Sequence, residues 1–104
     1  MDPKEIFNSL VNEFGLKANP IMHDTWINVK YKNYGGFLMQ LRCDDNNNYI
    51  CFIAKGIDCK KGVLWGADSY YDYEKAKDKI NEFILLDKQY NIENMINAVN
   101  DDFN

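Results

Sequence analysis

The stretch TWINVKYKNYGGFLMQLRCDDNNNYICFIA, residues 25–54, decides the fold of this chain. Residues 25–32 and 37–43 alternate between two kinds of side chain, and residues 49–54 are almost wholly apolar. Period-2 alternation rich in β-branched and aromatic residues is typical of a half-buried strand, and a short apolar run fits a strand covered on both faces. The stretch therefore predicts three antiparallel strands joined by two short turns.

The two turns set the register of these strands. Residues 33–36 suit a three-residue hairpin loop, with Gly35 in the left-handed conformation that costs other residues energy. Shifting the pairing by one residue would place Ile27 against Arg42, so the apolar pattern favours the unshifted register. The predicted cross-strand pairs are Tyr31–Phe37, Val29–Met39, Ile27–Leu41, Leu41–Cys51 and Met39–Ile53. All of these side chains then share one core face.

The opposite face of the predicted sheet mixes polar and apolar residues. It carries Asn28, Lys30, Lys32, Gln40 and Arg42 together with Trp26, Leu38, Ile50 and Phe52. Such a face is either covered by another part of the chain, a helix for example, or it binds something. We expect cover from within the chain, because most apolar faces of this kind belong to a core.

The segment before the sheet predicts one helix. Asp2 can cap it, Pro3 suits its first turn, and Gly15 is a natural stop. Between them, Ile6, Phe7, Leu10, Val11 and Phe14 form an apolar stripe at helical spacing that we expect on the core face of the sheet. Residues 16–24 are expected to be a connection that Pro20 keeps extended.

The segment after the three strands predicts a further strand and two helices. Residues 60–62 form a turn, and Val63–Trp65 form a short fourth strand. Asp72 or Ser69 caps a helix over about 70–88, and Asn91 caps a short third helix. The predicted fold class is therefore α+β: a three- or four-stranded antiparallel sheet with an N-terminal helix and two C-terminal helices, in a single domain spanning 1–104.

Composition narrows the classes of function. The chain has 104 residues and a formal net charge of −4, which argues against binding to a phosphate backbone and allows a basic protein partner. No stretch is long enough to span a bilayer and the start lacks a signal pattern, so we expect a cytoplasmic protein with no membrane contact. An odd count of three cysteines fits reduced thiols.

No cofactor and no metal site is predicted. Cys43, Cys51 and Cys59 are eight residues apart, whereas zinc sites use close pairs. The loop that starts at Asp44 resembles a calcium loop only in its first residues. It has Tyr49 where the sixth position requires Gly and Lys55 where the twelfth requires Glu.

A catalytic alternative rests on three residues at one end of the sheet. The register places His23 opposite Asp45, with Cys43 nearby. A thiol, an imidazole and a carboxylate are the nucleophile, base and orienting group of covalent catalysis. No local sequence signature supports this set, and a polar turn containing a small apolar Cys explains the same residues.

The favoured functional surface is the segment WGADSYYDYE, residues 65–74. Tyr and Trp are enriched at the energetic centres of protein interfaces. The residues predicted to contact a partner are Trp65, Asp68, Tyr70, Tyr71, Asp72 and Glu74, with Asp44 and Asp45 as a second, weaker site. The competing interpretation is that Trp65 and Tyr73 belong to the core and the rest is a polar cap.

These observations predict a small, acidic, non-enzymatic protein-binding module. Its expected partner is a larger basic protein, for instance a nucleic-acid-binding enzyme, and no direct contact with nucleic acid is expected. Phage and mobile-element inhibitors of host defence nucleases, anti-CRISPR proteins among them, share this profile at the level of a class. The alternatives are a Cys/His-dependent enzyme or ligand-binding domain, and nucleic-acid binding through Lys30, Lys32 and Arg42 with Trp26 and Phe52 as stacking rings.

Overall fold

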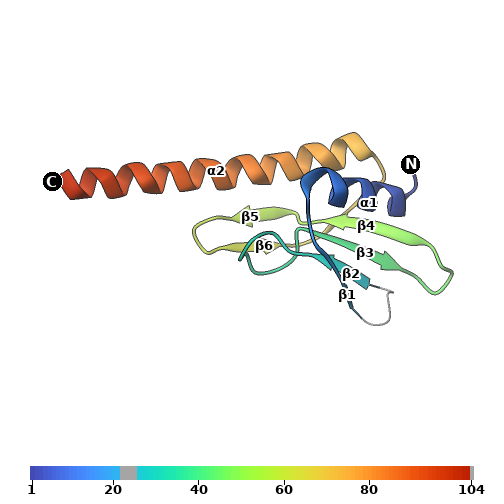
Figure 1. The fold of residues 1–104 in the computed structure, drawn as a ribbon. Helices are drawn as coiled ribbons and strands as arrows, with labels where there is room; N and C mark the ends of the chain where they lie inside the picture. The colour runs from blue at the N-terminus through green and yellow to red at the C-terminus, as the bar shows by residue number, and fades with distance from the viewer. Residues whose placement is uncertain (22–25, 104) are drawn as a thin grey trace.

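A computed structural model of the chain describes the backbone of residues 1–21 and 26–103 and the side chains of residues 1–19 and 26–95. The elements are α1 (Pro3–Phe14), β1 (Ala18–Ile21), β2 (Trp26–Val29), β3 (Met39–Cys43), β4 (Tyr49–Ile53), β5 (Gly56–Asp58), β6 (Val63–Trp65), β7 (Asp68–Tyr70) and α2 (Tyr73–Phe103). Five strands form an antiparallel sheet in the order β1-β2-β3-β4-β7, and β5 and β6 form a separate hairpin (Figure 1). The α+β class is confirmed.

The predicted register of the central strands is also confirmed. β2 pairs with β3 so that Val29 lies opposite Met39 and Ile27 opposite Leu41. The next pairing, of β3 with β4, places Leu41 opposite Cys51 and Met39 opposite Ile53. Slipping any strand by one residue would turn its apolar side chains away from the core, so burial specifies the register.

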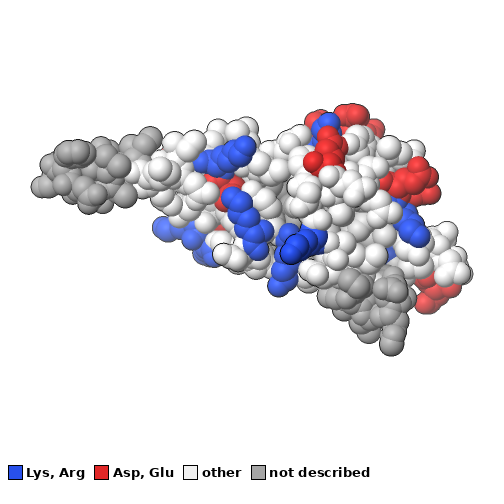
Figure 2. Space-filling model, viewed as in Figure 1, with Lys and Arg blue, Asp and Glu red and all other residues white. Residues whose placement is uncertain are grey.

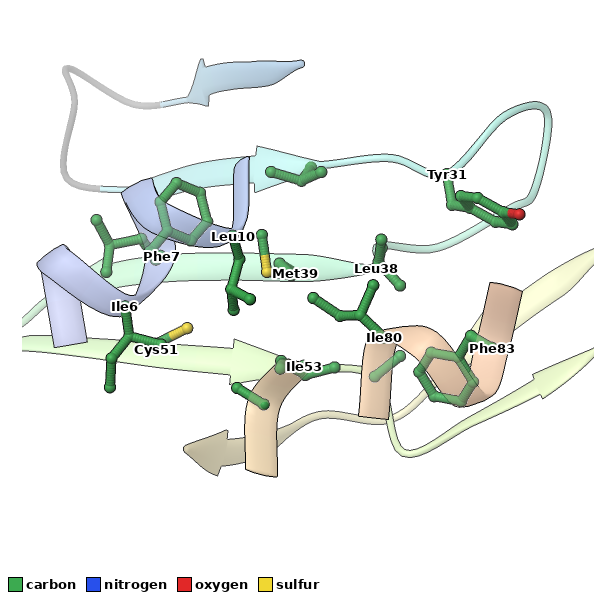
Figure 3. Packing of buried hydrophobic residues seen from close by; sticks show 14 of the residues in the cluster. Ile6, Phe7, Leu10, Tyr31, Leu38, Met39, Cys51, Ile53, Ile80 and Phe83 are labelled. Carbon is green, nitrogen blue, oxygen red and sulfur yellow. The ribbon is translucent and has the colours of Figure 1, made fainter. Parts of the chain in front are cut away.

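Both helices lie on this one face of the sheet and bury their apolar stripes against it (Figures 1 and 3). The buried helix residues are Ile6, Phe7 and Leu10 of α1 and Ala76, Ile80 and Phe83 of α2. α1 begins and ends as predicted. The Asp2 carboxylate accepts a hydrogen bond from the Glu5 backbone N–H at 2.8 Å, and Gly15 closes the helix with φ at 61°.

The predicted tight hairpin between β2 and β3 is wrong. β2 ends at Val29, and a longer loop follows, with positive φ at Lys32 and Gly36 rather than at Gly35. Tyr31 and Phe37 do not pair: Tyr31 is buried, whereas Phe37 is exposed. Long-range hydrogen bonds hold this loop open. The Gly35 N–H donates to the Gly62 carbonyl, the Gly35 carbonyl accepts from the Leu64 N–H, and both distances are 2.8 Å.

Two strands of the sheet were missed and one was misplaced. The segment expected to be a connection contains β1, which pairs along β2. The neighbour of β4 in the sheet is β7, a short polar strand that includes Ser69, whereas Val63–Trp65 pairs only with β5. The two missed strands, β1 and β7, are the edge strands of the sheet, which one partner strand holds in place and which need no apolar alternation of their own.

The two predicted C-terminal helices are one continuous helix, α2. Gln89, Tyr90 and Asn91 interrupt the apolar pattern, but none of them is Gly or Pro, so the backbone continues as helix. α2 runs well beyond the sheet (Figure 1), and the molecule measures 62 × 27 × 21 Å along its principal axes. Within the described residues, no helix has both the length and the hydropathy to cross a bilayer.

Candidate functional site

The face of the sheet opposite the core is the main candidate surface. Both helices lie on the core side, so no helix of the described chain covers this face (Figure 1). The expected cover from within the chain is only partial: Gly66 and Ala67 line one side of a hollow there. Leu38, which the alternation placed on this face, is instead fully buried in the core. It precedes β3 and therefore does not follow that strand's alternation.

This hollow has a volume of about 410 Å³ and an aromatic lining. Its principal side chains come from β2, the β2–β3 loop, β3 and β4, and they are Trp26, Phe37, Gln40, Arg42 and Phe52. Trp26 and Phe37 remain 38% and 40% exposed. A concave surface that leaves large rings in water is a common feature of binding sites.

Polar side chains at the floor of the hollow hold one another in place. Gln40 is buried and donates from Nε2 to Asn28 Oδ1 at 2.6 Å. Its side-chain oxygen accepts a hydrogen bond from Arg42 Nε. The Arg42 guanidinium lies 4.7 Å from the Trp26 ring centroid and 4.6 Å from that of Phe52. These contacts fix Arg42 between two rings, which lowers the entropy it would lose on binding.

One of the three cations that the nucleic-acid alternative requires does not lie on this face of the sheet. Lys32 was predicted on this face, but its ammonium lies 2.6 Å from Asp87 Oδ2 of α2, on the helix side of the sheet. Arg42 also occupies the space between the Trp26 and Phe52 rings, where a base would stack. The predicted placement of Lys32 is therefore wrong.

The 65–74 segment does not form one outward surface. Trp65 and Tyr71 are 56% and 67% exposed, as a contact surface requires. Tyr70, by contrast, lies opposite Cys51 in β4 and packs against the core, so its predicted role in partner contact is not supported by its position. Tyr73 is half-buried, and its hydroxyl donates to the Glu13 carboxylate of α1.

The carboxylates of this segment are divided between structural and exposed positions. Asp72 precedes α2 and accepts a hydrogen bond from the Lys75 N–H at 3.2 Å, as a helix cap does. Asp68 lies 3.7 Å from the Lys55 ammonium, an ion pair in which both side chains are half-exposed. Glu74 is exposed in the first turn of α2. Neutralised or helix-bound carboxylates attract a distant basic partner less strongly.

The Asp44–Asp45 site is mainly a turn. The Asp44 carboxylate accepts hydrogen bonds from the N–H groups of Asn46 and Asn48, both at 2.9 Å, so it holds the β3–β4 connection together. Asp45 is exposed beside it. Asp44 and Asp45 thus lie in the turn at the end of the sheet toward which β7 runs, because β7 pairs antiparallel with β4.

The catalytic alternative gains nothing from the structure. Its base, His23, lies outside the described residues. The Cys43 thiol is near the Asp44 carbonyl at 3.6 Å and the Asn47 amide oxygen at 4.0 Å, both of which are turn atoms. Cys51 is fully buried, and burial raises the pKa of its thiol to about 12. Among the described residues, no group of His, Cys, Asp and Glu side chains is arranged to hold a metal ion.

A polar cluster that sequence reasoning missed centres on Asp87 of α2. This buried carboxylate accepts hydrogen bonds from the Tyr31 hydroxyl at 2.9 Å, the Lys32 ammonium at 2.6 Å and the Tyr34 hydroxyl at 2.7 Å. Burial alone would raise the pKa of Asp87, but these three donors outweigh it and hold the pKa below its ordinary value. Burial and the neighbouring Asp87 carboxylate in turn raise the pKa of Tyr34.

The position of Asp87 in the sequence indicates that its carboxylate needs hydrogen-bond donors. Asp87 continues the spacing of the buried positions 76, 80 and 83 on α2, and a carboxylate on a buried stripe needs donors. The cluster ties α2 to the β2–β3 loop. Because every oxygen of Asp87 already has a partner, we interpret the cluster as structural.

Charge is distributed unevenly over the visible face of the molecule (Figure 2). Acidic side chains gather around α1 and the start of α2, and basic side chains gather below the middle of α2, towards the β5–β6 hairpin. Comparisons with models of protein families, with curated proteins and with solved structures return no match, so residue chemistry and geometry alone bear on function here.

Proposed function

We propose that this protein is a non-enzymatic binding module that engages a protein partner through the helix-free face of its sheet. The observation that carries the proposal is the aromatic hollow, in which exposed rings surround a guanidinium already held in place. Trp, Tyr and Arg dominate the energetic centres of protein interfaces, and a preorganised centre loses less entropy on binding.

This proposal moves the contact surface away from residues 65–74. Within that segment, Tyr70 packs against the core and Asp72 caps α2, which leaves Trp65 and Tyr71 as its exposed rings. Phe37 and Trp26 line the aromatic hollow, whereas Tyr71 is not part of its lining. A concave centre excludes water from a contact more effectively than a lone exposed ring.

The partner is proposed to be a larger basic protein. A net charge of −4 and the acidic surface around α1 would steer a basic partner towards the molecule, and rising salt would weaken that attraction. A narrower version makes the protein an inhibitor of a nucleic-acid-binding enzyme. That version predicts that the captured partner loses nucleic-acid binding when it is in the complex.

The test is affinity capture from the native host with mass spectrometry, followed by a binding titration with the purified partner. Phe37→Ser should weaken binding at least about 30-fold, as the loss of a central ring does. Tyr71→Ser is the matched control, because it removes an exposed ring outside the hollow, and it should bind like the wild type. If Tyr71→Ser abolished binding and Phe37→Ser did not, the contact would lie at residues 65–74 instead.

A further inference from the structure

Beyond Ile84, the described part of α2 leaves several large apolar side chains exposed. Leu85, Ile92 and Met95 are 56%, 56% and 69% exposed. Figure 1 shows α2 passing the β5–β6 hairpin and then extending beyond it, and no other described element lies beside the end of the helix. A run of large apolar side chains in water along a helix is a common sign of a missing partner.

The stripe has the spacing of a coiled coil. Positions 85, 89, 92, 96, 99 and 103 follow one another at intervals of four and three residues, and they are Leu, Gln, Ile, Ile, Val and Phe. Alternating intervals of four and three form the inward seam of a two-stranded coiled coil. At 1.5 Å per residue, the seam covers about 27 Å of helix. Upstream of Leu85 the same spacing meets Glu82, so the apolar seam begins at Leu85.

The described apolar residues of the seam, Leu85 and Ile92, lie on the side of α2 that faces away from its own core. With 3.6 residues per turn, Leu85 and Ile92 project roughly half a turn away from Phe83 and Asp87, which face the sheet. On one flank, the seam residue Gln89 and its neighbour Glu93 line a shallow hollow together with Ile57 of β5, whereas Leu85 and Ile92 lie outside this hollow. A second helix can therefore approach Leu85 and Ile92 without displacing the sheet.

We propose that the occupant of this seam is a second copy of the same chain, packed as a parallel, in-register coiled coil. Charge complementarity carries the choice. Lys88 and Glu93 flank the seam on opposite sides, five residues apart, which is the spacing at which flanking charges of two parallel helices pair. Both side chains are exposed, and neither belongs to an ion pair among the described residues.

Gln89 supports the same arrangement. It is the one polar residue on the seam, and a single polar residue at such a position sets register and oligomeric state. In a parallel, in-register pair, the two Gln89 amides face each other and can hydrogen-bond. The two sheets then lie at the same end of the dimer on opposite outer sides, which leaves both aromatic hollows free.

The test is sedimentation equilibrium of the full chain over a range of concentrations. The wild type should approach twice the 12.2 kDa mass of one chain, and Ile92→Asp should weaken dimerisation at least about 100-fold because it puts a charge in the seam. Asn91→Asp is the matched control, since it adds the same charge one position away from the seam, and it should dimerise like the wild type. Far-UV and near-UV circular dichroism show that both variants remain folded.

Charge reversal tests the parallel register. Lys88→Glu and Glu93→Lys should each weaken the dimer roughly tenfold, and the double reversal should restore it, because the pairs are then opposite in sign again. A wild type that stays monomeric at millimolar concentration, or an Ile92→Asp variant that dimerises normally, would overturn the second copy as occupant. A double reversal that stays weak would overturn the parallel arrangement.

Discussion

At the scale of single residues, Asp87 is the strongest determinant of how the elements are joined. Its carboxylate is 2% exposed and takes donors from Tyr31, Lys32 and Tyr34, all in the β2–β3 loop. Desolvating a carboxylate is costly, and three donors offset that cost only while the loop stays against α2. The bond network therefore couples the position of the loop to the position of the helix.

Asp87→Ala should lower the free energy of unfolding by about 3 kcal/mol, because it leaves two hydroxyls and an ammonium without their acceptor. Urea denaturation at pH 7 measures the loss. Asp78→Asn, an exposed carboxylate on the same helix, is the control and should change stability by less than about 0.5 kcal/mol. Equal losses in the two variants would contradict a structural role for the cluster.

The same residue predicts a dependence on pH. Because the pKa of Asp87 is lowered in the folded state, its contribution is fully present above its ordinary pKa of 3.8 and is lost as the pH falls through the lower folded value. The wild type should therefore lose more stability than Asp87→Asn between about pH 4 and pH 2. If the free energy of unfolding fell equally in the two proteins over this range, the folded state would not favour the ionised form of Asp87.

At the scale of elements, the β5–β6 hairpin is attached to the sheet through glycines of the β2–β3 loop. A Cβ at Gly36 would collide with the carbonyl of Leu64, and φ at Gly36 is 79°. Gly62, in the hairpin turn, has φ at 68° but open space around it. Of these two glycines, only Gly36 is required by a close approach of two backbones.

Gly36→Ala should therefore cost more than Gly62→Ala. The second substitution isolates the strain of a left-handed residue, about 1 kcal/mol, whereas the first adds a backbone collision and should cost more than about 3 kcal/mol. Thermal or urea unfolding of the two variants measures the difference. Similar losses would mean that the hairpin can move away from Gly36 at little cost.

At the scale of the whole molecule, α2 gives the chain an elongated shape. The radius of gyration over Cα atoms is 16.0 Å, whereas a compact chain of this length has about 13 Å. The cause is a 31-residue helix of which only the first half has a sheet to pack against. The two proposals therefore use different parts of the molecule: the sheet face for a partner and the free helix for self-association.

Small-angle X-ray scattering tests this shape at concentrations where Ile92→Asp is monomeric. The variant should give a radius of gyration well above 13 Å, and removing residues 92–104 should bring the value closer to that of a compact chain. A value near 13 Å for the intact variant would mean that the end of α2 folds back, and the seam would then not be free for a second chain.

The sequence by itself determined the central register, the start and end of α1, and the face on which the core lies. Those features follow from local patterns: period-2 alternation in β2 and β3, a capping Asp2 and a closing Gly15. The aromatic composition of the outer face could be predicted as well, because alternation places Trp26 and Phe52 there.

Only the tertiary structure decided what lies at the edges and across elements. β1 and β7 are short edge strands whose pairing with a neighbour, rather than their own pattern, makes them strands. The inward turn of Lys32, which the alternation placed on the outer face, depends on Asp87, which is 55 residues away. The open sheet face depends on both helices packing on the same side, and contacts between distant segments have no periodic signature in the sequence.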